Sequence, residues 1–530
     1  MAYRQGKRYQ MMMFPPTIED FVPEDHPARV YDAFVEGLAF EKLDFKINGF
    51  DKVGNPEYDP KSLLKIILFG YSYGERSSRR LERCVHDNTI FMWLACGLKP
   101  DHATIARFRQ RNKKLLKKIF KQCAQLCIKL KLIEGNTLFV DGTKIRANAG
   151  IKNTVTKTHL KEQLKNIESR INTILKECDK ADAKEAHMGS FVKLREELNS
   201  IEKIRTSVKK ALAEIDQENS DDINLTDPDC KKMKGRQGTH SGYNAQVVVD
   251  EKYGLIVSND VVNDANDLNQ FSKQINTANK ILEKNCENAC GDAGYSNVCD
   301  LKNSVNQGIN VVVPNQKQAE YHKKEDTGFE KEYFKYDKEK DEYMCPEGKR
   351  LIYKRTEAQQ NNRKVYLIEN SLICKKCVHF DKCTKCKRGR EIKRHTDESL
   401  KEKLAEIYLT KQGQVIYKKR KEKIELVFGH IKHNLKVNSF LLRRFDGVKS
   451  EMAVLSTVFN IRRMITLLGT TKLIEAMALL NDPDTVLFVF SRYIIGSPIN
   501  FMRHFFIKLF TGYRINSAMT TELKMINVFG

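Results

Sequence analysis

The chain has 530 residues, of which 41% are hydrophobic, and this is enough to build cores for about two to four domains. Its 92 lysines and arginines exceed its 68 aspartates and glutamates, so the net charge is +24. Such an excess indicates a polyanionic partner, either nucleic acid or an anionic membrane surface, unless it serves solubility alone. An integral membrane protein is not expected, because the most apolar late segment, 486–510, is interrupted by charged side chains.

The N-terminal segment, "MAYRQGKRYQMMMFPP", has no apolar core of the length that a secretory signal needs. We therefore expect an intracellular, cytoplasmic protein. Its 14 cysteines are then expected to be reduced, so a cysteine cluster would indicate metal binding rather than disulfide bonds.

Residues 1–130 are predicted to be helical and to form a helix-turn-helix-like DNA-binding region. The segment 111–131 holds eight lysines or arginines and no acid, which favours contact with phosphates over a solvated helix face. The arginines of "SSRR" and "RFRQ" are the candidate contacts: Arg79, Arg80, Arg107 and Arg109. For the first pair, a position at a helix N-terminus is an equally simple explanation.

The stretch "NTLFVDGTKIRANA" is predicted to be a short strand that ends on an acid. Its apolar run, 138–140, leads directly to Asp141, and a loop is expected from there to residue 150. An Asp-Gly pair is also common in ordinary turns. Residues 156–217 are polar, free of proline and spaced with leucine and isoleucine, which predicts an inserted helical hairpin.

A β-hairpin is predicted over 241–262, followed by a helix, by Asp292 in "CGDAGYSN", by another helix and by a short strand at "GINVVVPN". This order predicts an α/β fold with a mixed sheet. Asp141 and Asp292 would then follow neighbouring strands. Two acids at the ends of neighbouring strands could share hard divalent cations, as metal-assisted phosphoryl transfer requires.

The third carboxylate is sought in a helical region that runs from about residue 400 to 468. One apolar stripe is formed by Ile424, Val427, Phe428, Ile431 and Leu435. At about 100° per residue, Glu425 and Lys432 lie together on the flank of this stripe, whereas Glu422 points to solvent. Glu425 is therefore the better candidate to reach a site at the sheet edge, although a surface glutamate paired with a lysine has the same pattern.

Five cysteines cluster in the charged segment 316–395, where two C-x-x-C pairs lie five residues apart. In a reducing compartment this spacing is a strong indication of a tetrahedral structural zinc site. There is one ligand more than such a site needs among Cys345, Cys374, Cys377, Cys383 and Cys386. No glycine-rich phosphate loop of the Walker type is present, so ATP use is not expected.

These segments together resemble the DDE transposases of bacterial insertion sequences, in the branch with a Tyr-Arg-Glu-Lys signature. The resemblance covers most of the chain, from "DHATIARFRQRN" through "VDGTKIRANA", "TDPDCKKM", "GYNAQVVVD" and "GDAGYSN" to "IELVFGHIKHNL". Single motifs such as "DGT" are weak evidence, but their joint order and spacing are specific. The resemblance implies a ribonuclease-H-like α/β catalytic domain with insertions, preceded by an all-helical DNA-binding region.

The resemblance also implies residue roles. Asp141, Asp292 and Glu425 would be the catalytic triad that binds Mg²⁺ or Mn²⁺, and Tyr417, Arg420 and Lys432 would hold DNA phosphates. The family's Cys-Pro-x-Gly knuckle favours Cys345, Cys374, Cys377 and Cys383 as zinc ligands, with Cys386 as a possible substitute. The partners would be double-stranded DNA, namely terminal inverted repeats and target DNA, bound by a homodimer at the bacterial nucleoid and not at a membrane.

The implied domains are residues 1–130 for DNA binding and residues 131–315 with 396–470 for catalysis. The helical hairpin 156–217 and the zinc-ribbon-like segment 316–395 would be insertions, and 471–530 would be a C-terminal helical tail.

The signature departs from the family pattern at Arg420, because four residues instead of three separate it from Glu425. On a continuous helix this spacing turns Arg420 about 140° away from Glu425. The helix could start after Arg420, a bulge could absorb the extra residue, or Arg420 could have another role. Two alternatives to a transposase remain: a non-catalytic DNA-binding descendant, and a metal-dependent nuclease that does not join strands.

Overall fold

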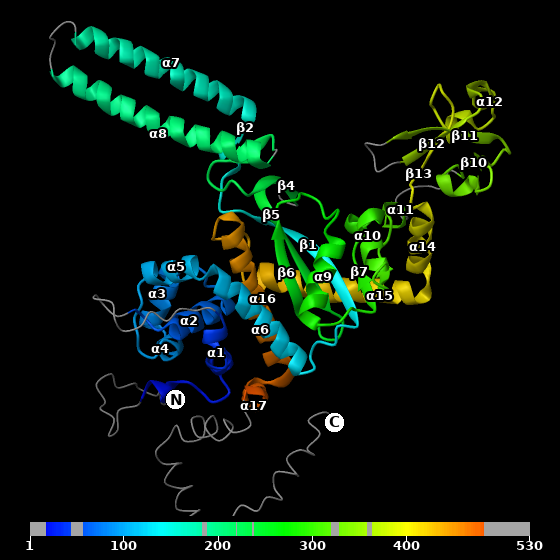
Figure 1. Ribbon diagram of the computed structural model, residues 1–530. Coiled ribbons are helices and arrows are strands. Elements are labelled where there is room, and N and C mark those ends of the chain that lie inside the picture. Colours follow the sequence, from blue (N-terminus) through cyan, green and yellow to red (C-terminus); the bar gives the residue numbers. More distant parts are fainter. Residues whose placement is uncertain are drawn as a thin grey trace, which may run out of the picture. The chain divides into compact units, whose positions relative to one another are not determined.

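The computed structural model describes residues 17–43, 57–182, 188–218, 220–235, 238–319, 328–357 and 363–481 (Figure 1). Its backbone divides into two compact units. The first comprises residues 1–118 and 461–530, and the second comprises residues 119–460.

The first unit is helical wherever the structure describes it. Its N-terminal helices are α1 (Ala28–Glu36), α2 (Pro60–Ser72), α3 (Ser78–Asp87), α4 (Thr89–Leu94) and α5 (His102–Arg111). The central helix α2 begins where the Asp59 carboxylate accepts hydrogen bonds from two backbone amides, and Pro60 occupies the first helical position. Every residue of α2 from Ser62 to Ser72 is buried. The expectation of an all-helical N-terminal region is confirmed for these residues.

The C-terminal helix α17 (Thr470–Asn481) belongs to this first unit, where it packs against α1. The Arg462 guanidinium, at the end of the long helix α16 (Arg444–Leu468), donates a hydrogen bond to the backbone carbonyl of Ser72 in α2. The N-terminal helices therefore share a core with a segment about four hundred residues later, which the predicted boundaries at 130 and 471 do not anticipate. Residues 482–530 of the predicted helical tail lie outside the described residues.

The second unit is built on a mixed sheet with the strand order β6-β5-β1-β7-β8. Strands β1 (Thr137–Arg146), β5 (Gly238–Asp250) and β6 (Ile256–Val262) pair antiparallel, and β5 also pairs antiparallel with β4 (Lys231–Gly235). The short strands β7 (Asn288–Cys290) and β8 (Asn310–Val312) run parallel to β1 and to each other. This arrangement confirms the predicted mixed α/β sheet and the predicted β-hairpin at 241–262.

The second unit also contains helices α9 (Phe271–Leu282), α10 (Val298–Val305), α14 (Glu398–Leu409) and α15 (Lys411–Gly429). Helix α6 (Lys113–Lys129) includes the residue at which the chain passes from the first unit to the second. In the central strand β1, Leu138, Phe139 and Val140 are fully buried. In the described part of the chain no single helix has the length and apolarity to cross a membrane. Only α16 and α17 taken as a pair pass that test of length and composition, and they are bent by 110° at their junction.

Two smaller elements are inserted in the chain of the second unit (Figure 1). The first is the antiparallel helix pair α7 (Lys157–Asp182) and α8 (Met188–Glu218), which begins and ends in the two-stranded sheet of β2 (Thr154–Thr156) and β3 (Asp222–Asn224). Leu160, Val208 and Ile215 form a small core beside that sheet. The pairing of β2 with β3 therefore brings together the two ends of the helical segment.

The second element is a five-stranded antiparallel sheet with the order β13-β12-β11-β10-β9. Its strands are β9 (Lys335–Asp337), β10 (Glu342–Met344), β11 (Arg350–Glu357), β12 (Arg363–Ile368) and β13 (Glu391–Arg394). The short helices α12 (Ser371–Lys375) and α13 (Phe380–Cys383) lie between β12 and β13. Tyr343, Leu351 and Tyr366 are buried at the centre of its own hydrophobic core.

Candidate active site

Asp141 lies inside a strand and not at its end, which corrects the sequence-based expectation. β1 continues to Arg146, and Asp141 is in register with Val247 of β5. On the other side of β1, the parallel pairing with β7 stops at Phe139 opposite Cys290. The apolar run ends at Val140, which is where burial along β1 decreases. The next four residues are only half-buried. Asp141 therefore occupies the point where β1 extends beyond its parallel neighbour.

Asp292 lies two residues after the end of β7 and caps the short 3₁₀ helix η4 (Ala293–Tyr295). Its Oδ1 atom accepts a hydrogen bond of 2.9 Å from the backbone amide of Gly294. Because β1 and β7 are parallel neighbours, their carboxyl ends bring Asp292 to the same sheet edge as Asp141.

Arg420 joins these two carboxylates. Its Nη2 atom lies 2.9 Å from Asp141 Oδ2 and 3.8 Å from Asp292 Oδ2, and the side chain is buried. Helix α15 is continuous from Lys411 to Gly429, so it neither starts after Arg420 nor contains a bulge before Glu425. The third possibility from the sequence therefore holds, because in this structure Arg420 pairs with acids and does not face solvent.

The two aspartates are held in an environment that disfavours their charged form. Burial raises the pKa of Asp141 to about 7, although Arg420 opposes the change, and the nearby carboxylates of Asp292 and Asp267 add to it. Burial also raises the pKa of Asp292, again against the effect of Arg420. Both carboxyl groups therefore keep a raised pKa although the Arg420 guanidinium lies between them. Such a pair of acids suits a site that receives a divalent ion.

Glu425 is exposed on α15, and the structure does not bring it together with the two aspartates. Most of the predicted apolar stripe is buried, at Ile424, Val427, Ile431 and Leu435. Within the described ranges, no group of three or more His, Cys, Asp or Glu side chains is placed to hold a metal ion. The helical pattern therefore identified the buried face of α15 but did not place Glu425 in a site.

The other two signature residues lie on the same helical segment. Lys432, in the π-helical turn that follows α15 (His430–Asn434), donates a 2.5 Å hydrogen bond to Thr143 Oγ1 on β1. Tyr417 is half-buried, with its ring centroid 5.2 Å from that of Tyr408 and 5.8 Å from the Arg420 guanidinium carbon. Arg420 thus contacts Asp141 itself, and Lys432 contacts β1 two residues further along at Thr143.

A further acid, Asp267, lies beside the two aspartates and was missed by the sequence analysis. Its Oδ1 atom accepts hydrogen bonds from Asn244 Nδ2 at 2.8 Å and from Gln246 Nε2 at 2.6 Å. The available signal was a pair of amide side chains at alternate positions of β5, because amides that are buried in a strand require hydrogen-bond partners.

The candidate DNA contacts of the first unit do not all face solvent. Arg79, Arg80 and Arg107 are exposed, and Arg80 forms a 3.3 Å ion pair with Glu75. Arg109 is buried instead, and its Nη1 atom donates hydrogen bonds to the Tyr71 hydroxyl and to the backbone carbonyl of Arg76. The expectation that Arg109 contacts DNA is therefore wrong, because its guanidinium is part of the interior of the helical unit.

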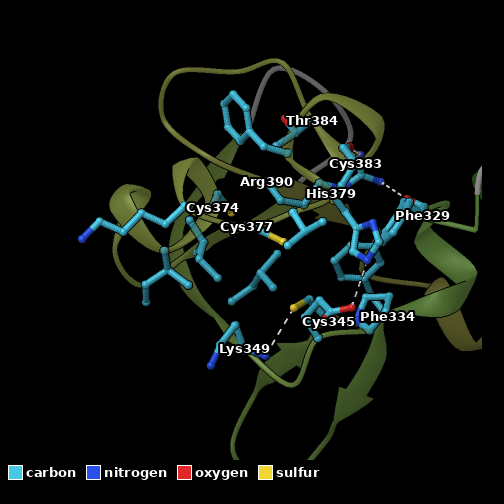
Figure 2. A pocket seen from close by; sticks show the side chains of 18 residues that line it. Phe329, Phe334, Cys345, Lys349, Cys374, Cys377, His379, Cys383, Thr384 and Arg390 are labelled. Atoms are coloured by element: carbon cyan, nitrogen blue, oxygen red, sulfur yellow. Dashed lines mark hydrogen bonds and ion pairs between the residues drawn. The ribbon is translucent and has the colours of Figure 1, made fainter.

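Four of the five clustered cysteines surround one cavity of about 520 Å³ in the five-stranded element (Figure 2). These four are Cys345, Cys374, Cys377 and Cys383, whereas Cys386 is exposed and does not line the cavity. Burial raises the pKa of the Cys383 thiol, Arg390 lowers it, and the other three thiols add to the rise. The four thiols are thus close enough to influence one another, although for the described residues their sulfur atoms are not drawn together as a formed metal site.

Comparison with known protein families gives two matches. Residues 16–111 match the model of a transposase domain (DUF772), and residues 344–465 match the model of a transposase DDE domain. Neither the curated proteins nor the solved structures gave a match to the chain. The first match covers α1 to α5, and the second extends from the five-stranded element through α15, including Arg420, Glu425 and Lys432.

Proposed function

Because the chain is a DNA transposase with a DDE catalytic domain, we propose that it cuts DNA at the ends of an insertion element and joins the freed 3′ ends to target DNA. A DDE domain implies a ribonuclease-H-like fold and catalysis by divalent metal ions. The mixed sheet of the second unit agrees with that fold. The observation that carries the proposal is the meeting of Asp141 and Asp292 around one cation at the parallel edge of the sheet.

Asp141 and Asp292 would hold the divalent ion, Mg²⁺ or Mn²⁺. Their carboxylates already share a positive group, the Arg420 guanidinium, which supports the proposal that they attract a cation. When bound, such an ion activates the attacking oxygen and stabilises the leaving oxygen in phosphoryl transfer. The residues of the chain position the ion and the DNA, and no covalent enzyme intermediate is required.

Glu425 is proposed as the third carboxylate of the DDE set. It lies within the segment that matches the DDE domain model. On a helix Glu425 and Lys432 lie on the same flank at about 100° per residue, and Lys432 contacts Thr143, two residues beyond Asp141. The contact of Lys432 with β1 supports the proposal that this flank faces the strand that carries Asp141.

Contacts to DNA phosphates are proposed for two regions. Lys432 and Tyr417 would hold the reacting strand beside the site, together with Arg420 where it is not paired with the acids. In the first unit, the exposed Arg79, Arg80 and Arg107 would bind the element ends. Because transposition pairs two ends, we propose that the chain acts as a homodimer on DNA.

A structural zinc ion is proposed for the five-stranded element. The residues that fit it are the four cysteines around the cavity of this element, Cys345, Cys374, Cys377 and Cys383. The mutual effect of their thiols on the Cys383 pKa supports a site that removes protons when it binds metal. Four thiolates would leave no open position, so the role would be structural.

The test uses the full chain with a supercoiled plasmid that carries the DNA flanking its gene, in Mg²⁺ or Mn²⁺. We expect strand cleavage followed by joining to plasmid DNA. Asp292→Asn and Glu425→Gln should abolish both steps, whereas Glu422→Gln, an exposed glutamate one turn earlier on α15, should have no effect. Full cleavage by Asp292→Asn would overturn the site, and cleavage without joining would indicate a nuclease.

A further inference from the structure

Asp267 lies in the loop between β6 and α9 and is only half-buried, yet one of its oxygens is firmly fixed. Asn244 and Gln246, which donate to Oδ1, are 1% and 0% exposed and stand at alternate positions of β5. Gln246 in turn accepts a 2.5 Å hydrogen bond from the hydroxyl of Tyr295, three residues after Asp292. A hydrogen-bonded chain thus connects the Asp267 carboxylate with the segment that carries Asp292.

The backbone of both catalytic aspartates makes room for this carboxylate. A Cβ atom on Gly142, which follows Asp141, would lie 2.5 Å from Asp267 Oδ1. A Cβ atom on Gly294 would lie 2.9 Å from Asp292 Oδ1 and 3.4 Å from Asp267 Oδ2. Asp267 therefore sits between the two segments, with Oδ2 on the side of Asp292, and any side chain at Gly142 would displace it.

A role in capping the following helix does not explain this position. The first backbone amide of α9, that of Phe271, donates to Asp300 Oδ2 at 2.9 Å, so the helix already has a carboxylate at its N-terminus. The Asp267 side chain turns away from the helix to Asn244 and Gln246 on the sheet. A third carboxylate beside two others is unfavourable unless positive charge compensates it, and Arg420 supplies only one charge.

From this geometry we propose that Asp267 is a further carboxylate ligand of the catalytic divalent ion, together with Asp141 and Asp292. The inference rests on the proposed function, since it concerns the same site. Carboxylates that bind metals are themselves held by hydrogen bonds from neighbouring side chains, and the two buried amides of β5 have that role here. Asn244 and Gln246 are accordingly positioning residues, which fix Oδ1 and leave Oδ2 for the ion.

The test measures Mn²⁺ binding by the DNA-free protein, from the loss of the free-ion signal in electron paramagnetic resonance, alongside cleavage. Asp267→Asn retains an oxygen that can accept both amide hydrogen bonds but removes the charge. We expect it to weaken Mn²⁺ binding at least about tenfold and to reduce cleavage with it. Asp264→Asn, in the same loop and exposed, is the matched control and should bind Mn²⁺ like the wild type.

A second variant distinguishes a ligand from a residue that only supports the loop. Asp267→Glu keeps the charge and should recover part of the Mn²⁺ affinity lost in Asp267→Asn. Equal losses in both variants, or wild-type Mn²⁺ affinity in Asp267→Asn, would overturn the inference. Asp292→Asn separates the two proposals, because the proposed active site itself fails if that variant binds Mn²⁺ and cleaves normally. If only Asp292→Asn loses binding, the inference fails alone.

Discussion

At the scale of single residues, burial disfavours the ionised form of the Asp141 and Asp292 carboxyl groups in the metal-free site. The raised pKa of Asp141 has a defined consequence for stability. Between its unfolded value of 3.8 and its folded value of about 7, the unfolded chain loses a proton that the folded chain keeps. The free energy of unfolding therefore decreases as the pH rises through this window, by up to about 4 kcal/mol. Above a pH of about 7 this loss of stability stays constant.

The prediction concerns Asp141→Asn, which is uncharged at every pH. In a chelating buffer its melting temperature should rise relative to wild type as the pH increases from 4 to 7 and then stay level. Scanning calorimetry at a series of pH values checks this, and Mg²⁺ should reduce the difference by stabilising the wild type alone. A difference between the two proteins that does not change with pH would show that Asp141 is not held in its neutral form.

Residue-level reasoning from sequence predicted that Asp141 and Asp292 follow neighbouring strands, and the structure places both carboxylates beside Arg420. It named Arg420 as a phosphate contact but could not anticipate its ion pairs with aspartates that are distant in the chain. It also missed Asp267, whose loop has no periodicity. The helical periodicity of apolar residues indicates which face of a helix is buried, so it correctly predicted the buried stripe of α15. It does not report where an exposed side chain such as Glu425 is directed.

At the scale of secondary-structure elements, helix α5 carries both an exposed arginine, Arg107, and a buried arginine, Arg109. Arg109→Ala should destabilise the protein by about 2–4 kcal/mol, because it leaves buried acceptors at Tyr71 and Arg76 without their donor. Arg107→Ala, two residues earlier and exposed, should leave stability unchanged and weaken DNA binding. Urea denaturation and fluorescence anisotropy with labelled DNA measure the two effects. Equal effects of both substitutions on stability would contradict the assignment.

The five-stranded element carries the zinc prediction. Purified protein should contain about one zinc ion per chain by elemental analysis. Cys374→Ser should lose this zinc and expose the element to proteolysis, whereas Cys386→Ser, outside the cavity, should retain it. Metal content that is unaffected by Cys374→Ser, or lost in Cys386→Ser, would assign the ligands differently.

Elements with strong local patterns were predictable. Both helices of the α7–α8 pair, the β5–β6 hairpin and the strand β8 lie where periodicity and turn residues place them. The exact extent of β1 was not predictable, because its last residues are held by β5, a strand about a hundred positions later. The local sequence pattern identifies a strand, but the neighbouring strand with which it pairs determines where that strand ends.

At the scale of the whole molecule, the net charge of +24 predicts that DNA binding depends strongly on salt. If about six to ten phosphates are contacted, affinity should fall about 10³- to 10⁵-fold between 50 and 200 mM salt. Anisotropy titrations over that range give the slope of log affinity against log salt. A slope near zero would contradict a binding surface made of exposed arginines and lysines.

The grouping of residues 1–118 with residues 461–530 could not be predicted from the sequence, because no local pattern indicates that α1 packs against α17. It also has a consequence during synthesis. A ribosome produces the helices of the first unit early, but α17 only after almost the whole catalytic domain has been made. The nascent chain therefore cannot finish the fold of its first unit until its catalytic domain has left the ribosome, so a truncated product would lack both the end of α16 and α17.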